Sequence, residues 1–360
     1  MWPNTRVLDL LGIKHPIIQA PMAGSVGSEL VIAVSESGGL GSLPCAMLSP
    51  AQMRTELGII RQRTSRAINL NFFCHVPPNE DALRMRAWKQ RLSGYYAELG
   101  LDPMAEPANV NRAPFNEAAC EVVEEFRPEV VSFHFGLPEQ SLLERVRATG
   151  AKIISSATTV DEARSLEDHG CDAIIAQGAE AGGHRGMFLG TDISSQPGTF
   201  ALVPQVVDAV KVPVIAAGGI SDARGIVAAF ALGASAAQIG TAYLFCPEAE
   251  VSTLHRDRLR RAKDDETVLT NVFTGRPARG LINRLIAEVG PIAEDAPEFP
   301  LAAAAVAQIR SAAEANGSSN FTSLWAGQAA ALGKDLPAGE LTLALAHDAL
   351  QIIRRGRARS

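Results

Sequence analysis

The chain is poor in the features that mark membrane, fibrous and nucleic-acid-binding proteins. Aromatic residues make up only 5% of its 360 residues, so a core must consist mainly of Ala, Val, Ile and Leu. Hydrophobic residues are 47% and charged residues 20%, which excludes a disordered, collagenous or coiled-coil chain. The net charge is −6 and no basic domain stands out, so no nucleic-acid partner is expected.

Cysteines are few, and none stands in a C-x-x-C motif. The five cysteines, at positions 45, 74, 120, 171 and 246, are odd in number and widely spaced. This pattern predicts a reduced cytoplasmic protein without a disulfide or zinc framework, and no metal site is expected. The first residues lack the basic segment and apolar run of a signal peptide. The uncharged stretch 225–247 could span a bilayer by length, but glycines and polar residues interrupt it, so no membrane partner is expected.

Several catalytic motifs are also absent. The chain has no phosphate-binding G-x-x-x-x-G-K-[ST] loop, no H-E-x-x-H zinc motif and no G-x-S-x-G nucleophile elbow. It also lacks G-x-G-x-x-G after its first apolar run, which argues against a doubly wound dinucleotide-binding sheet, the main structural alternative.

Short apolar runs alternate with longer amphipathic runs along most of the chain. The apolar runs predict eight strands, at 15–20, 39–43, 67–74, 129–135, 151–157, 171–177, 212–217 and 234–240. The runs between them predict helices at 28–37, 49–63, 116–126, 139–149, 160–169, 200–210 and 221–232. Eight strands joined by right-handed helical crossovers favour an α/β fold, a (β/α)8 TIM barrel.

Two segments break this alternation and indicate the domain organisation. We expect residues 1–245 to form the barrel, with an insertion at about 75–115 after the third strand. Residues 246–322, which include a charged run and an alanine-rich run, are expected to form a helical cap. Residues 323–360 are expected to be helical and to pack back on the barrel.

Glycine-rich turns follow the first, seventh and eighth predicted strands, at the end of a barrel where active sites lie. The turn 19–24 is small and contains a proline, and alone it could be an ordinary turn. The turns 217–220 and 238–241 can present backbone N–H groups to a phosphate, although glycine turns also serve packing.

Three further segments place polar and aromatic side chains at the same end. The loop 176–186 surrounds His184 and Arg185 with glycines, which favours a functional histidine over a structural one. Asn71 lies near the end of the third predicted strand and could contact a heterocycle. Phe73 and His134, near the ends of the third and fourth predicted strands, are candidates for a substrate pocket, and Phe73 could equally be core.

These motifs together resemble the nitronate monooxygenases, formerly called 2-nitropropane dioxygenases. The resemblance runs from about Gly12 to Leu244 and resumes weakly at TGRPARGLINR and SLWAGQ. The motifs that carry it are PMAG, NLNFF, FHFGLP, AQGAEAGGHRG, AAGGI and QIGTA. GGHRG with AGGI is typical of a wider group of FMN barrels that includes enoyl reductases. NLNFFCH with SFHFGLP indicates the class that oxidises nitronates.

The resemblance implies an FMN-dependent TIM barrel with a helical cap. His184 matches the catalytic histidine, and His134 lies in a matching motif. Phe299 departs from the family, in which a tyrosine precedes the following proline. The residues implied in FMN binding are Pro21, Met22, Ala23, Asn71, Gln177, Gly182, Gly183, Gly218, Gly219, Gln238, Ile239, Gly240 and Thr241.

The implied reaction converts an alkyl nitronate and O2 to a carbonyl compound and nitrite, with propionate 3-nitronate as the favoured substrate. A nitronate is already a carbanion equivalent and needs no base, so we expect His184 to act on it as a hydrogen-bond donor or a positive charge. If the enzyme uses neutral nitroalkanes, His184 must instead act as the base that removes their proton. The alternatives are an NAD(P)H-dependent flavin reductase and a flavin-free phosphate-binding isomerase or aldolase. A cytoplasmic monomer or homodimer is expected.

Overall fold

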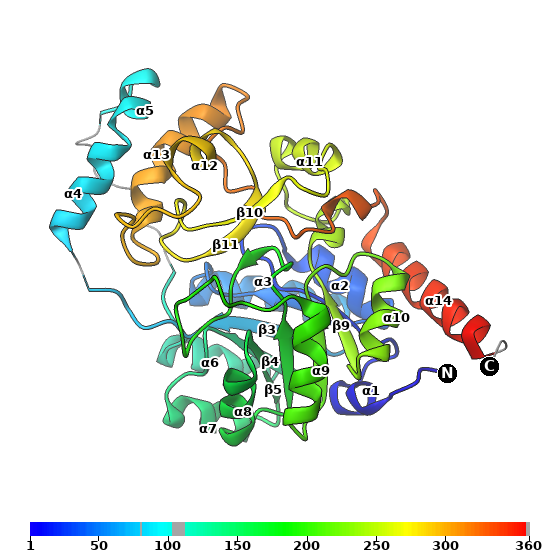
Figure 1. The fold of residues 1–360 in the computed structure, drawn as a ribbon. Helices are drawn as coiled ribbons and strands as arrows, with labels where there is room; N and C mark the ends of the chain where they lie inside the picture. The colour runs from blue at the N-terminus through cyan, green and yellow to red at the C-terminus, as the bar shows by residue number, and fades with distance from the viewer. Residues whose placement is uncertain (80, 103–111, 358–360) are drawn as a thin grey trace.

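The computed structural model describes residues 1–79, 81–102 and 112–357, and its core is a barrel of parallel strands (Figure 1). Eight strands are hydrogen-bonded in the order β1-β9-β8-β6-β5-β4-β3-β2, and a parallel bridge between Ile18 and Leu40 brings β1 beside β2. The strands are β1 (Ile17–Gln19), β2 (Gly41–Pro44), β3 (Ile68–Phe73), β4 (Val130–His134), β5 (Lys152–Ala157), β6 (Ala173–Gln177), β8 (Val214–Ala217) and β9 (Ala236–Ile239). All eight predicted strands and the TIM-barrel class are thereby confirmed.

Helices cover the outside of the strands, and several of them begin or end at residues typical of helix caps. The covering helices are α2 (Ser28–Glu36), α3 (Pro50–Arg63), α6 (Glu117–Phe126), α7 (Gln140–Ala148), α8 (Val160–Asp168), α9 (Thr199–Ala209) and α10 (Ala223–Ala231). Ser49 forms a reciprocal capping box with Gln52 before the proline that starts α3. Gly150, Gly170 and Gly233 have φ of 92°, 80° and 94°, the left-handed conformation in which glycine ends a helix.

The interior of the barrel is closed at its amino-terminal end by α1 (Arg6–Leu11), a helix that the sequence did not predict. Val7 and Leu11 of α1 pack against the inward-facing Ile18, Ile154 and Ile215. This bottom is therefore sealed by apolar side chains, and ligands can enter only from the opposite, carboxyl-terminal end of the strands.

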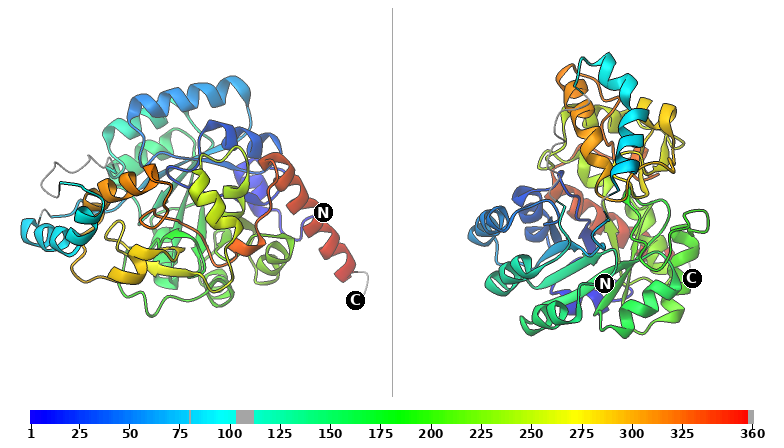
Figure 2. Two further views of the ribbon diagram at one scale, coloured as in Figure 1. Left: turned by 90° about the horizontal axis from the view of Figure 1, so that it is seen from above. Right: turned by 90° about the vertical axis from the view of Figure 1, so that its left-hand side faces the viewer.

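The cap sits over the carboxyl ends of the strands and is not purely helical (Figure 2). It includes α4 (Ala82–Arg91), α5 (Ser93–Glu98), α11 (Thr253–Arg260), α12 (Arg284–Val289) and α13 (Ala302–Ala315). It also contains an antiparallel sheet of β10 (Thr267–Thr270), β11 (Ala278–Leu281) and β7 (Gly183–His184), which was not predicted. These strands are two or four residues long, too short for a clear alternation of apolar and polar residues.

The insertion after β3 is part of this cap. Trp88, Leu92 and Tyr96 are buried in the same apolar cluster as Leu285 and Ile309 of the later segment. Two stretches that are almost two hundred residues apart therefore share one core. The proposed domain boundaries stay a prediction, but any cap domain must include both stretches.

The carboxyl-terminal segment is helical only in its second part. Residues 323–337 run as an extended segment with the short 3-10 turn η2 (Ala330–Leu332), and helix α14 (Ala338–Arg357) follows. The expectation of a helix from residue 323 was wrong over this first part, because Pro337 and glycines 327 and 333 interrupt it. Leu341 and Leu345 of α14 join the layer between strands and helices, and Figure 1 shows α14 beside α10. α14 is thus the helix that follows the eighth barrel strand, with the cap inserted before it.

No helix within the described ranges is long and apolar enough to cross a membrane. The stretch that raised this question forms α10, β9 and the 3-10 helix η1 (Thr241–Phe245).

Candidate active site

A cavity of about 1370 Å³, its open mouth included, lies between the carboxyl ends of the barrel strands and the cap. Its walls come from β3, β4, β5, β6, β8 and β9 and from loops at the carboxyl ends of the strands, including the turn that follows β1. The predicted residues that line it are Pro21, Met22, Ala23, Asn71, Phe73, His134, Gln177, Gly182, Gly183, His184, Gly218, Gly219, Gln238, Gly240 and Thr241. Ile239 does not line it, because its side chain is buried in the layer between strands and helices and its carbonyl accepts a hydrogen bond from Ala20.

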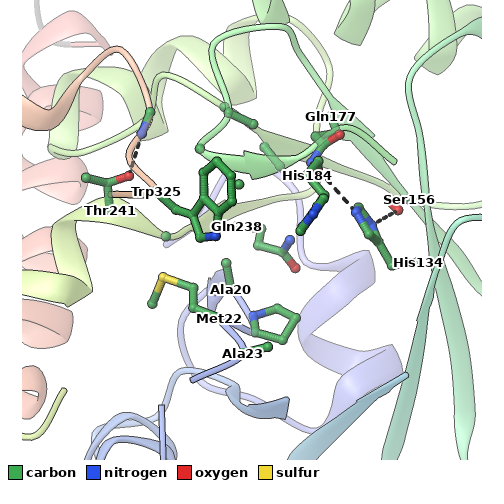
Figure 3. A pocket seen from close by; sticks show the side chains of 18 of the residues that line it. Ala20, Met22, Ala23, His134, Ser156, Gln177, His184, Gln238, Thr241 and Trp325 are labelled. Atoms are coloured by element: carbon green, nitrogen blue, oxygen red, sulfur yellow. Dashed lines mark hydrogen bonds between the residues drawn. The ribbon is translucent and has the colours of Figure 1, made fainter. Parts of the chain in front are cut away.

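Two walls face each other across the cavity (Figure 3). Ala20, Met22 and Ala23 line one side, and Gln177 and His184 approach from the other. Trp325, which belongs to the extended segment before α14, reaches into the space between them. An elongated, flat ligand would therefore be held between the turn after β1 and the loop after β6.

The backbone geometry requires glycine at several positions in the wall of the cavity. Gly218 and Gly219 have φ of 112° and 69°, where other residues are strained. A Cβ on Gly182 would lie 2.5 Å from the backbone nitrogen of Gly327, so only glycine allows the carboxyl-terminal segment to pass there. The hydroxyl of Thr241 accepts from the same Gly327 nitrogen at 2.9 Å. The predicted phosphate turns are thus joined to a third segment, 325–329, that sequence reasoning did not assign.

The amino terminus of α10 is capped by a side chain of its own segment. The carboxylate of Asp222 caps it, accepting from the backbone N–H groups of Arg224 and Gly225. These two donors are consequently not free for a phosphate, and the turn 218–221 must supply the contacts itself.

An unsatisfied polar group in the cavity wall bears on its fit to a flavin. The side-chain oxygen Oε1 of Gln238 is buried and has no hydrogen-bond partner in the described part of the chain. A buried acceptor without a donor costs free energy, so it calls for an N–H or O–H group of a ligand. The glycine turns at one end of the cavity fit the phosphate of a flavin mononucleotide, and the unpaired amide oxygen of Gln238 fits an N–H group of its ring system. No group of three or more metal-ligating side chains occurs among the described residues.

A hydrogen-bonded network holds the backbone of His184. The His184 carbonyl accepts from Gln177 Nε2 at 3.0 Å and from His134 Nε2 at 3.2 Å. Because a carbonyl cannot donate, His134 carries its proton on Nε2, and its Nδ1 accepts from the Ser156 hydroxyl at 2.6 Å. Burial lowers the pKa of His134 to about 3, so it is neutral at pH 7. His134 therefore positions His184, and Gln177 shares that task besides facing the cavity.

The His184 side chain points into the cavity beneath aromatic rings. Phe299 lies 5.2 Å and Trp325 5.5 Å from its ring centre. Its Nε2 lies 2.9 Å from Thr274 Oγ1, whose own proton can go to the Arg276 carbonyl at 3.3 Å. This arrangement makes His184 Nε2 the donor and leaves Nδ1 with a lone pair.

His184 is uncharged in this environment. Burial lowers its pKa well below the ordinary value, and the charge of Arg112 lowers it further. The expectation of a positive charge on His184 is thus not supported for the free protein. A neutral imidazole with an available lone pair can accept a proton or a hydrogen bond.

Arg185 is neither a surface residue nor a cavity charge. It is fully buried, and its guanidinium donates to the carbonyls of Gly178 at 2.6 Å and Gln177 at 2.8 Å. Its role is to hold the end of β6 in place beneath the loop that carries His184.

Acid should destabilise the protein through the buried histidines. Burial lowers the pKa of His134 to about 3 and of His255 to about 4, against about 6.5 in an unfolded chain. Between these values the unfolded chain binds more protons, so stability is complete above about pH 6.5 and falls as the pH drops toward 4. Each histidine then contributes a slope of roughly 1.4 kcal/mol per pH unit. We expect the Tm, measured by circular dichroism, to decrease as the pH is lowered from 6.5. The decrease should be less steep in His255→Gln. A Tm that stays unchanged from pH 7 to pH 5 would contradict this prediction.

Comparison with known proteins gives a consistent result over the whole chain. A family model described as nitronate monooxygenase matches residues 4–348. A nitronate monooxygenase of Pseudomonas aeruginosa is 40% identical over 345 residues, which cover 95% of this chain and 98% of that protein. A probable nitronate monooxygenase of Staphylococcus aureus is 39% identical over 362 residues, covering 98% and 99% of the two chains.

Solved structures with the same fold extend this similarity. A nitroalkane oxidase from Streptomyces ansochromogenes superposes with a TM-score of 0.88 at 36% identity, covering 97% of this chain and 99% of that chain. FabK from Thermotoga maritima superposes with a TM-score of 0.76 at 28% identity over the full length of both chains.

Proposed function

Because the chain belongs to the nitronate monooxygenase family of oxidoreductases, we propose that it oxidises alkyl nitronates with O2 to a carbonyl compound and nitrite. We propose FMN as its cofactor and propionate 3-nitronate as its substrate. The observation that carries this proposal is one cavity that joins glycine turns at one end to His184 under an aromatic roof at the other.

The proposed cofactor would be held by the residues that line the cavity opposite His184. Gly218, Gly219 and Thr241 would surround its phosphate, and Gln238 would accept from a ring N–H group. When bound, FMN supplies the electron transfer between the nitronate and O2, which no side chain here can perform.

The chain's own residues bind and position the substrate. Phe73, Phe299 and Trp325 surround His184 with ring centres at 6.3, 5.2 and 5.5 Å, so apolar side chains would flank the reacting end of the substrate. The backbone network of Gln177 and His134 fixes where the His184 ring stands. A nitronate needs no deprotonation, so the side chains need only position it.

The proposed setting is the cytoplasm, with the protein acting as a monomer or homodimer. All five cysteines are free, which suits a reducing compartment.

The test is a turnover assay on the protein purified with its bound flavin. With propionate 3-nitronate in air, we expect O2 uptake together with nitrite and an aldehyde, and no requirement for NADH. Nitrite absent from the products, with O2 uptake only when NADH is added, would overturn the proposal.

A further inference from the structure

An arginine with unsatisfied nitrogens stands in the wall of the cavity. Arg112 lines it, and the Nε and Nη1 atoms of its guanidinium are buried without a hydrogen-bond partner among the described residues. A buried guanidinium with two idle donors is costly unless a ligand accepts from them. Sequence reasoning missed this residue, because nothing in the segment ANVNRAPF marks an arginine as buried.

Arg112 is the one charged side chain among the described residues that line the cavity, which include no Asp or Glu. Burial lowers its pKa only to about 10, so it stays protonated at pH 7. The neighbouring His75 has its pKa lowered to about 4 and His184 well below its ordinary value, so both are neutral. Among the described residues that line the cavity, the positive charge therefore belongs to Arg112, while the charges of Arg276 and Arg310 act from residues outside this lining.

The position of Arg112 separates it from the glycine turns. Its guanidinium carbon lies 5.7 Å from the centre of the Phe299 ring, and Phe299 in turn lies 5.2 Å from the His184 ring. The one charged group that shifts its pKa is Arg310, which lies on α13 of the cap. A ligand anion near Arg112 would thus lie close to His184 and on the substrate side of the cavity.

We propose that Arg112 determines substrate specificity by binding a carboxylate at the far end of the substrate, and so selects nitronates that carry a second negative charge. A carboxylate is the anion that a guanidinium binds best, and it can accept from Nε or from Nη1, each of which is an idle donor on a different edge of the group. This inference rests on the proposed function and adds the residue that binds the carboxylate of the substrate.

The experiment compares two nitronates of similar length that differ in this group, propionate 3-nitronate and propyl-1-nitronate. In Arg112→Gln, the ratio of their kcat/KM values should fall roughly 10- to 100-fold, the range of a lost charged hydrogen bond, and mainly through KM. Arg112→Lys should keep more of the ratio because it keeps the charge. Arg261→Gln, an exposed cap arginine away from the cavity, is the matched control. An equal loss on both substrates would show that Arg112 only supports the aromatic roof, and would overturn the inference.

A binding measurement separates this inference from the proposed function. Calorimetry on the flavin-loaded protein should show succinate binding more tightly than butyrate, with Arg112→Gln losing roughly 10-fold or more of that preference. If the wild type oxidises neither nitronate but shows this pattern, the proposed function fails and the anion site stands. If succinate and butyrate bind alike in both proteins, the Arg112 assignment fails whatever the turnover shows.

Discussion

Replacing Gly219 by Asp should abolish FMN retention. Gly219 has a φ of 69°, and a Cβ there would lie 3.3 Å from the Cβ of Glu180. The new carboxylate would stand beside the Glu180 carboxylate and where the cofactor phosphate is proposed to bind. Three negative groups in a partly buried turn repel strongly, because screening by water is weak there. We expect the purified variant to be colourless, with FMN below a tenth of one equivalent.

Two controls separate charge from backbone strain. Gly219→Ala adds the Cβ without a charge and should weaken FMN binding less. Gly317→Asp places the same residue at an exposed position with a φ of 73°, so it matches the backbone conformation far from the cavity. FMN content should be measured by absorbance after denaturation. Full FMN occupancy in Gly219→Asp would refute the phosphate assignment.

Replacing His184 by Asn should affect neutral nitroalkanes more than preformed nitronates. The neutral imidazole has a free lone pair, so it can take the proton that a nitroalkane must lose. We expect kcat/KM on a nitroalkane to fall roughly 100- to 10,000-fold, the usual loss for a general base. On the matching nitronate the loss should be smaller, because only an interaction with the already formed anion is removed.

Both forms of one nitro compound should be assayed in the same buffer, with FMN content checked. His347→Asn, on the exposed face of α14, is the matched control. Losses of equal size on both forms would mean that His184 acts by binding the anion and not as a base. Near-normal rates on both would make it a structural histidine.

The barrel could be predicted because its strands are buried on both faces. Runs such as 171–177 are almost continuously apolar, and the glycines after them mark the turns. His184 and the glycine turns could be placed at one site, since a barrel brings the carboxyl ends of its strands together at one edge. The individual FMN-binding residues were implied by the family resemblance. The cap sheet could not be predicted, because β7 and β11 pair only through long-range contacts between residues 183–184 and 278–279.

The electrostatics of the site were beyond sequence reasoning. His184 looked like a candidate cation, but its charge depends on burial and on Arg112, which lies 72 positions earlier in the chain. Nothing in the glycine-rich loop marks Arg185 as buried, yet it is fully buried against two carbonyls. Residue type alone does not report the surroundings that decide a pKa.

The most direct test of the account is anaerobic mixing of the flavin-loaded protein with propionate 3-nitronate and, separately, with NADH. The cavity near His184 carries the positive charge of Arg112 and suits a small anion, so the nitronate should change the visible flavin spectrum within the time of turnover. NADH at the same concentration should change it far more slowly. Rapid loss of the flavin absorbance with NADH, and none with the nitronate, would contradict the account and assign the protein to the flavin reductases.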